Sequence, residues 1–241
     1  MAFRNSLAIC LLLAVLGSIS AGPLSARNPA AMAMLESIMK KSKWDSFVFS
    51  QEWPATVCSS SSRKCYFPEN RNTWTVHGLW PSKSDGTYGP SNCETDAEFS
   101  EATLAPILDD LEKQWTDVFG ESDEYSFWKH EWSKHGTCAA QLEALDSALK
   151  YFEKGLELNT NYNLTSIFLD SNIVPGNSYS LKQYTKAVES VTGAKSTVRC
   201  ASKGSARVQE IRICFDKKFN VIDCFEDSNC HTKSINYEDN N

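Results

Sequence analysis

Three of the four histidines of this chain lie in two short segments rich in aromatic residues. Residues 74–81 read WTVHGLWP, and residues 127–138 read FWKHEWSKHGTC. If the second segment is helical, residues four apart share a face, so His130 lies above Lys134 and Glu131 lies above His135. Such groups suit phosphoryl transfer, in which one group removes a proton, another protonates the leaving oxygen and a cation stabilises charge.

The second catalytic histidine has to come from another segment. His77 fills this position on a predicted strand, and Gly78 after it is expected to let a substrate approach closely because it has no side chain. His231 stands beside Cys230, far from any aromatic cluster, and is interpreted as structural.

A metal site is the alternative interpretation of the second segment. The metalloprotease pattern HExxH places two histidines four residues apart on one helix face. Here His130 and His135 are five apart, which separates them by roughly 140° on an α-helix, and the correct spacing is occupied by Lys134, which cannot bind a metal while protonated. We therefore expect no metal and no other cofactor.

Composition limits the class of protein. The chain has 241 residues, 41% of them hydrophobic and 22% charged, which predicts one large globular domain and excludes disorder, collagen and coiled coil. Lys and Arg total 24 against 30 Asp and Glu, a net charge of -6. The basic excess of a protein that coats duplex nucleic acid is missing, so any nucleic-acid contact must be local.

The N-terminus has the layout of a secretory signal in residues 1–21, with Arg4 before an apolar stretch at 7–16. We expect removal of the signal near Ser20 or Ala21. A retained anchor is the alternative, but this run is shorter than the roughly 20 residues of a bilayer span. The mature protein is thus expected to be secreted or lysosomal, without a membrane segment.

Cysteine content agrees with an oxidising compartment. The chain has nine cysteines, and loss of the signal removes Cys10 and leaves an even number, which favours four disulfides. No CxxC pair suggests zinc. The number of possible pairings, about 105 for eight cysteines, leaves the connectivity open. Asn163 begins the only N-glycosylation sequon, Asn-Leu-Thr, and is predicted to carry a glycan after secretion.

Apolar periodicity predicts an α+β order of elements. Alternation indicates strands at 47–53, 73–80, 199–202, 208–215 and 221–225, with a hairpin turn at 217–220. Three- and four-residue spacing indicates helices at 99–115, 125–138, 142–158 and 181–191, the last ended by Gly193. We expect a loosely held segment at 22–43, a single catalytic domain at 44–232 and a loosely held polar tail at 233–241.

The two histidine segments resemble the two active-site signatures of the ribonuclease T2 family, secreted endoribonucleases that include the plant self-incompatibility ribonucleases. Residues 49–54, FSQEWP, and the cysteine pattern extend the resemblance from Trp44 to Cys230. The resemblance implies a mainly antiparallel sheet packed with helices. It also implies four disulfides, pairing Cys58 with Cys65, Cys93 with Cys138, Cys200 with Cys230 and Cys214 with Cys224.

The same resemblance implies a role for each site residue. His135 is then the general base on the ribose 2′-hydroxyl and His77 the general acid at the 5′-oxygen. Glu131 and Lys134 stabilise the transition state, and His130 holds the phosphate. The nucleophile belongs to the substrate, so RNA is cut through a 2′,3′-cyclic phosphate and DNA is not.

Base recognition is expected to be weak. The resemblance places a base between Trp80 and Tyr88, and stacking on such rings tolerates any base. Ser82 stands where some family members carry an acidic base-specifying residue, and Glu52 stands where some carry Gln at a second base site. Four other tryptophans are predicted to be core residues: Trp53, Trp74, Trp128 and Trp132.

The sequence thus predicts a secreted, monomeric, metal-independent endoribonuclease that acts on single-stranded RNA with an acidic pH optimum. We expect Glu131 to raise the pKa of its neighbour His135, and Lys134 to oppose charge on His130 and on His77 if it is near. Two other functions remain open, a binding or signalling protein on the same fold and a metallohydrolase.

Overall fold

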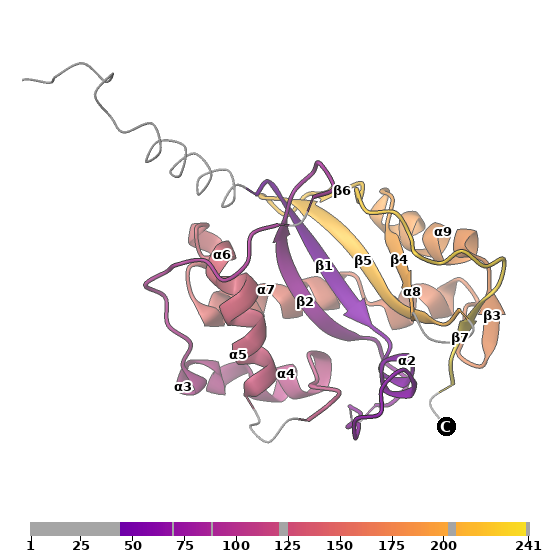
Figure 1. Cartoon of the computed structure of the whole chain (residues 1–241), viewed down its shortest axis with the longest axis horizontal. Coiled ribbons are helices and arrows are strands. Elements are labelled where there is room, and N and C mark those ends of the chain that lie inside the picture. The colour runs from indigo at the N-terminus through magenta and orange to yellow at the C-terminus, as the bar shows by residue number, and fades with distance from the viewer. Residues whose placement is uncertain (1–43, 69, 88, 121–124, 202–205, 240–241) are drawn as a thin grey trace, which may run out of the picture. The chain divides into compact units, whose positions relative to one another are not determined.

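An antiparallel sheet lies at the centre of the fold (Figure 1). The computed structural model describes residues 44–68, 70–87, 89–120, 125–201 and 206–239. Strands hydrogen-bond in the order β2-β1-β5-β4, and β6 pairs with β5. The bounds are β1 Ser46–Glu52, β2 Thr75–Ser82, β4 Thr197–Cys200, β5 Val208–Asp216 and β6 Val221–Ile222. A separate two-stranded sheet pairs β3, Asn177–Tyr179, with β7, Ile235–Tyr237.

Helices flank the sheet at both ends of the strand order, with α4, α5 and α6 on the side of β2, and α8 and α9 on the side of β4 (Figure 1). Helix α7 packs against β1 and β2. The bounds are α2 Pro54–Ser59, α3 Glu101–Leu104, η2 Ala105–Ile107, α4 Leu108–Gln114, α5 Ser126–Glu131, η3 Trp132–Gly136, α6 Thr137–Ala139, η4 Glu143–Leu145, α7 Ala148–Asn161, α8 Leu164–Asp170 and α9 Leu181–Thr192. The α+β prediction is confirmed. Among the described residues, no helix is long and apolar enough to cross a membrane.

Local sequence signals explain where the longer helices begin and end. The Ser180 side chain accepts from the backbone N–H of Gln183, and the Gln183 side chain accepts from the backbone N–H of Ser180, a capping box that starts α9. Gly193 ends the helix in the left-handed conformation with φ of 69°, as predicted. The hairpin predicted at 217–220 is also confirmed, since β5 and β6 pair on either side of it.

The aromatic core lies between the sheet and the helices. Trp53, Trp74, Trp128 and Trp132 are each 2% exposed or less, which confirms them as core residues. The indole N–H groups find acceptors inside, because Trp53 Nε1 donates to Glu238 O at 2.8 Å and Trp128 Nε1 donates to Trp115 O at 2.8 Å. These two tryptophans are thereby buried without an unpaired donor, whereas the Nε1 of the buried Trp44 has no partner among the described residues.

Strand β2 is an edge strand, and the helices satisfy its outward backbone groups. Trp115 Nε1, just after α4, donates to His77 O at 3.1 Å, and the Tyr151 hydroxyl of α7 donates to Leu79 O at 2.8 Å. Covering an edge in this way removes free carbonyls that could pair with another chain. These bonds also fix the backbone on both sides of Gly78.

The structure corrects several predicted elements. The helix expected at 99–115 is split into α3, η2 and α4, with Pro106 inside the break. Helices α2 and α8 were not predicted, because each has only six or seven residues and too few periodic positions. Residues 1–43 lie outside the described part of the chain, so the signal at 1–21 and the loose segment at 22–43 stay predictions.

The C-terminal residues are not a loose polar tail. Ile235 and Tyr237 in β7 are 0% and 2% exposed, and Trp74 Nε1 donates to the Tyr237 hydroxyl at 2.6 Å. Arg207 forms an ion pair with Glu238 at 3.1 Å. Two buried side chains in a short polar segment were too weak a signal to predict this packing.

All four disulfides implied by the resemblance are present. They join Cys58 to Cys65, Cys93 to Cys138, Cys200 to Cys230 and Cys214 to Cys224. The Cys93–Cys138 bridge spans 45 residues and ends in α6, directly after the second histidine segment. It therefore ties that segment to the loop that follows β2.

Candidate active site

A β-bulge positions His77. On β1, Ser50 pairs with Gly78 but Gln51 pairs with Val76, so His77 is an extra residue of β2 with no partner on β1. In a regular strand His77 and Trp80, three positions apart, would lie on opposite faces. Bulges bend a strand and redirect its side chains. Here both side chains line the same cavity, and their rings lie 5.0 Å apart.

A π-helical turn positions the second segment. The α5 helix ends at Glu131, and η3 continues it as a π-helix through Lys134 and His135. Bonding in a π turn runs from residue i to i+5, so residues five apart come closer to one face than in an α-helix. His130 and His135, expected on different faces, both line the cavity.

The loop before α3 holds this turn in place. Asn92 N donates to Lys134 O at 2.9 Å, and Cys93 N donates to Thr137 Oγ1 at 3.2 Å. The bonds flank the Cys93–Cys138 disulfide. These hydrogen bonds therefore hold the π turn at the Lys134 carbonyl, in its middle, and at Thr137, directly after its C-terminal end.

A cavity of about 490 Å³ collects the predicted catalytic groups. It brings together the predicted residues His77, Trp80, His130, Glu131, Lys134 and His135. Glu52 and Phe127 also line it. The volume is in the range of small-molecule and nucleotide sites, and its ionisable groups are three imidazoles, three carboxyl groups, the Lys134 ammonium and the Arg63 guanidinium.

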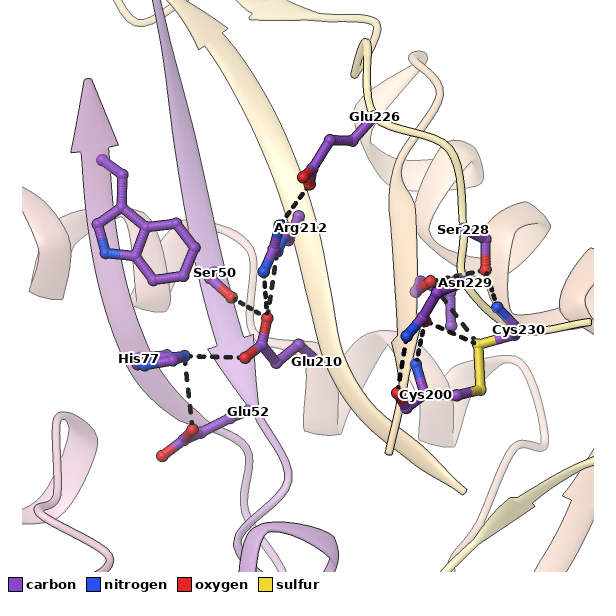
Figure 2. A network of polar contacts seen from close by, with 12 residues as sticks. Ser50, Glu52, His77, Cys200, Glu210, Arg212, Glu226, Ser228, Asn229 and Cys230 are labelled. Carbon is purple, nitrogen blue, oxygen red and sulfur yellow. Dashed lines mark hydrogen bonds and ion pairs between the residues drawn. A yellow bond between two sulfur atoms is a disulfide. The ribbon is translucent and has the colours of Figure 1, made fainter. Parts of the chain in front are cut away.

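Two buried glutamates approach His77 from the sheet, as Figure 2 shows. Glu210 Oε1 lies 3.0 Å from His77 Nδ1, and Glu52 Oε2 lies 3.6 Å from the same nitrogen. Both carboxylates belong to residues only 6% exposed. On its other oxygen Glu210 accepts from Arg212 Nη2 at 2.8 Å, and Arg212 also binds Glu226.

These contacts favour a charged His77. Burial alone would lower its pKa, but attraction to Glu52 and the hydrogen bond with Glu210 outweigh burial and raise the pKa to about 10. Burial alone would raise the pKa of Glu210, but the hydrogen bond with His77 and the positive charges of His77 and Arg212 lower it to about 2. Glu52 lacks an arginine partner, and burial raises its pKa to about 7. His77 and Glu210 thus form an ion pair across the neutral range.

The surroundings of His135 favour the neutral form. Burial is the largest cause of a pKa lowered to about 3, and the positive charges of Lys134 and His130 act in the same direction. His135 Nδ1 is buried and has no hydrogen-bond partner among the described residues. The expectation that Glu131 raises the pKa of His135 is wrong, because the Glu131 carboxylate is directed to another partner.

That partner is Trp80. Its Nε1 donates to Glu131 Oε2 at 2.9 Å, and burial raises the pKa of Glu131. Gly78 lies beneath the contact, since a Cβ there would sit 2.1 Å from Trp80 Nε1 and 2.3 Å from Glu131 Oε2. The glycine therefore makes room for this hydrogen bond, and not for substrate as the sequence suggested.

A second cavity of about 360 Å³ lies on the other side of Trp80. Ser82, Phe225 and Glu226 line it, together with Lys134 and His135. The Arg212 guanidinium lies 5.1 Å from the centre of the Trp80 ring. Tyr88, the other predicted base-stacking residue, lies outside the described residues.

Comparison with known proteins places this geometry in a family. The model of the ribonuclease T2 family matches residues 44–224. The chain belongs to the ribonuclease T2 family. It is 36% identical to Ribonuclease Oy of Magallana gigas over 187 residues, covering 75% of this chain and 87% of the relative. It is 35% identical to human Ribonuclease T2 over 182 residues, covering 73% and 68%.

Solved structures of T2-type ribonucleases have the same fold. RNase NT in complex with 5′-AMP superposes with a TM-score of 0.70 at 29% identity, covering 81% of this chain and 98% of that one. Ribonuclease MC1 from bitter gourd seeds gives a TM-score of 0.70 at 27% identity, covering 80% and 100%. As a member of the T2 family, the protein is an endoribonuclease.

The sequence analysis missed the polar groups on β5 that contact His77 or its partner Glu210. Glu210 and Arg212 are charged residues within the apolar run Val208–Phe215, and a charged residue at a buried strand position is a recognisable signal. Glu52 was noted only for base binding. Together with His77 and Glu210 it places three potential ligand atoms within 4.8 Å of one another, a group that could hold a metal ion, although Arg212 and Ser50 already bind Glu210 Oε2.

The glycosylation sequon lies at the start of α8. Asn163 Oδ1 accepts from Ser166 N at 3.0 Å as the N-cap, and Thr165 Oγ1 accepts from Trp74 N at 3.1 Å. The cap uses the side-chain oxygen of Asn163, whereas a glycan would be attached through the nitrogen. Whether Asn163 is glycosylated stays a prediction.

Proposed function

We propose that this protein cleaves single-stranded RNA without a metal, by attack of the ribose 2′-hydroxyl on the adjacent phosphate. The observation that carries the proposal is the pair of histidines on one cavity with opposite pKa shifts. A general base must be neutral and a general acid protonated at the same pH. His135 meets the first requirement and His77 the second.

In the first step His135 removes the 2′-hydroxyl proton through Nε2, since its Nδ1 is buried. The 2′-oxygen bonds to phosphorus, the bond from phosphorus to the 5′-oxygen breaks, and His77 protonates that oxygen as it leaves. The products are a 2′,3′-cyclic phosphate and a free 5′-hydroxyl. Hydrolysis of the cyclic ester by water then follows with the two histidines in exchanged roles.

The remaining groups of the cavity stabilise the phosphorane. Lys134 and His130 are exposed at its mouth and supply positive charge and hydrogen bonds to the phosphate. Glu131 acts in its protonated form, donating a hydrogen bond to a non-bridging oxygen while its other oxygen accepts from Trp80. Burial makes the protonated form accessible because it raises the pKa of this carboxyl group.

An acidic optimum follows from Glu131 more than from the histidines. With pKa values of about 3 and about 10, the histidine pair is correctly protonated over a wide range. As the pH rises through the raised pKa of Glu131, this residue loses its proton and becomes an anion beside the phosphate. Activity should therefore fall on the alkaline side, and the net charge of -6 repels RNA further there.

Base recognition uses the second cavity, where one base stacks near Trp80 with little selectivity. Position 82 carries serine and not an acidic side chain that could hydrogen-bond to a base edge. This supports the proposal of weak base specificity. Delivery to the cell exterior or the lysosome is part of the proposal. Extracellular ribonuclease LE of Solanum lycopersicum, 32% identical over 198 residues, supports this location by its name.

Cleavage assays on matched substrates test the proposal. Single-stranded RNA should be cut to 2′,3′-cyclic phosphate ends in the presence of EDTA, and a substrate with one 2′-deoxy sugar at the scissile position should resist. Glu131→Gln, which keeps a donor at every pH, should flatten the alkaline fall of the rate. Cleavage of the deoxy substrate or loss of activity with EDTA would overturn the mechanism.

A further inference from the structure

Glu52 and Glu210 are directly opposite each other on neighbouring strands. The register pairs Glu52 of β1 with Glu210 of β5, and Ser50 with Arg212 one step away on the same face. Like charges in this position destabilise a sheet, and the two residues are buried. A stable fold would not retain such a pair unless cations compensated it.

Two cations compensate the pair from opposite sides (Figure 2). Arg212 donates to one oxygen of Glu210, Oε2, from both Nε at 3.1 Å and Nη2 at 2.8 Å, and these charge-assisted bonds hold that side of the carboxylate. His77 binds the other oxygen through Nδ1 at 3.0 Å. Glu210 is thus anchored on the sheet and directed at the back of the imidazole.

We propose that Glu210 is the positioning residue of the general acid, holding His77 by Nδ1 so that the protonated Nε2 faces the leaving 5′-oxygen, while Glu52 retains the charge on the ring. The inference rests on the proposed role of His77. In this role Glu210 and Glu52 contact His77 and not the RNA. Their effect is exerted on the tautomer, orientation and charge of the imidazole.

Charged groups reach His77 from every element packed around it. Glu52 faces it from β1, Glu210 with Arg212 from β5, and Glu131 from α5. Lys134, His130 and the neutral His135 lie on the opposite wall of the cavity, which Arg63 and Asp117 also line. The carboxylates on the sheet side therefore stabilise the proton on His77, whereas positive charge on the opposite wall favours the loss of that proton.

Leaving-group dependence separates this role from a structural one. Cleavage of an RNA dinucleotide needs protonation of the leaving 5′-oxygen. In a nucleoside 3′-(4-nitrophenyl phosphate), the 4-nitrophenolate group leaves without taking up a proton. His77→Ala should therefore fail on the dinucleotide and retain most of its rate on the nitrophenyl ester. Glu210→Gln should show the same split in milder form, with a loss of roughly 10-fold or more on the dinucleotide only.

The pH profile gives an independent readout. In a Glu131→Gln background, where the fall set by Glu131 is removed, Glu210→Gln and Glu52→Gln should each move the remaining alkaline limb of kcat/KM on the dinucleotide to lower pH, Glu210→Gln further, because only Glu210 is within hydrogen-bond distance of Nδ1. Proton NMR should show the Nδ1–H signal of His77 in the native protein and its shift in Glu210→Gln. Glu238→Gln, which removes an Arg–Glu ion pair at the C-terminus, is the matched control and should change neither substrate's rate.

The outcomes distinguish the two proposals. Equal losses on both substrates in His77→Ala would show that His77 is not the acid, which overturns the proposed function and this inference with it. A leaving-group split in His77→Ala without one in Glu210→Gln would overturn the inference alone. Equal losses on both substrates in Glu210→Gln, with the unfolding temperature kept, would do the same.

Discussion

His77 and His135 face one cavity from surroundings of opposite charge. His77 lies on the sheet beside the buried carboxyl groups of Glu52 and Glu210, and its pKa is raised to about 10. His135 lies in a helical segment, buried and next to Lys134 and His130, and its pKa is lowered to about 3. The proposed mechanism gives identical side chains different proton-transfer roles because the elements that carry them surround them with different charges.

The sheet side and the helical side of the cavity are joined by the hydrogen bond between Trp80 and Glu131. The Trp80 ring lies 5.0 Å from the ring of His77 and 5.5 Å from that of His135. It therefore stands between the two histidines and connects the sheet to the helix. In the proposed mechanism the sheet supplies the acid and the helical segment supplies the base, and their alignment depends on residues between them such as Trp80.

Removing either histidine should have the largest effect. His77→Ala and His135→Ala should each lower RNA cleavage by about 10²- to 10⁴-fold, the usual contribution of one proton transfer. Initial rates and circular dichroism on the purified proteins would check this. An active His135→Ala protein with an unchanged fold would break the assignment of acid to sheet and base to helix.

Loss of the Cys93–Cys138 bridge should loosen the helical side. With 45 residues in the loop, the chain-entropy treatment predicts a loss of about 4 kcal/mol for the paired change to Ala. The matched control is the Cys58–Cys65 bridge, whose separation of 7 predicts about 2 kcal/mol. Urea unfolding would measure both, and a larger loss in the control would contradict the ranking.

Gly78→Ala should disrupt the contact between the sheet side and the helical side of the cavity. The added methyl group would overlap Trp80 Nε1 and Glu131 Oε2, so their hydrogen bond must break and leave a buried carboxyl group without its donor. A cost of about 1–3 kcal/mol in stability is expected, with a fall in kcat. Chemical unfolding and steady-state kinetics would show it, and a variant with native stability would mean that the contact is dispensable.

Lys134→Gln should give the most specific effect on the pH profile, in addition to the loss of rate expected when a cation that stabilises the phosphorane is removed. The Lys134 cation lowers the pKa of His135, so its removal should raise that pKa. Since the base must be neutral, the acidic limb of the pH–rate profile should move to higher pH. The profile of kcat/KM would decide, and an acidic limb shifted to lower pH would have the wrong sign.

Much of the fold could be predicted because it rests on local signals. Alternation of apolar residues located β1, β2, β4, β5 and β6 within a few residues, and Gly193 marked the end of α9. The family resemblance supplied the disulfide pairing, which spacing alone left open. Prediction failed for short elements such as α2 and for β7, whose two buried residues become apolar contacts only after distant segments meet.

The sequence by itself determined which chemical groups the protein has, since His77, Glu131, Lys134 and His135 stand in two dense aromatic segments. Tertiary structure decided how they act. A bulge turned His77 towards Trp80, a π turn brought His130 and His135 to one cavity, and β5 placed Glu210 behind the imidazole. The physical reason is that pKa and orientation depend on charges and burial supplied through space by residues such as Glu210, 133 positions away along the chain.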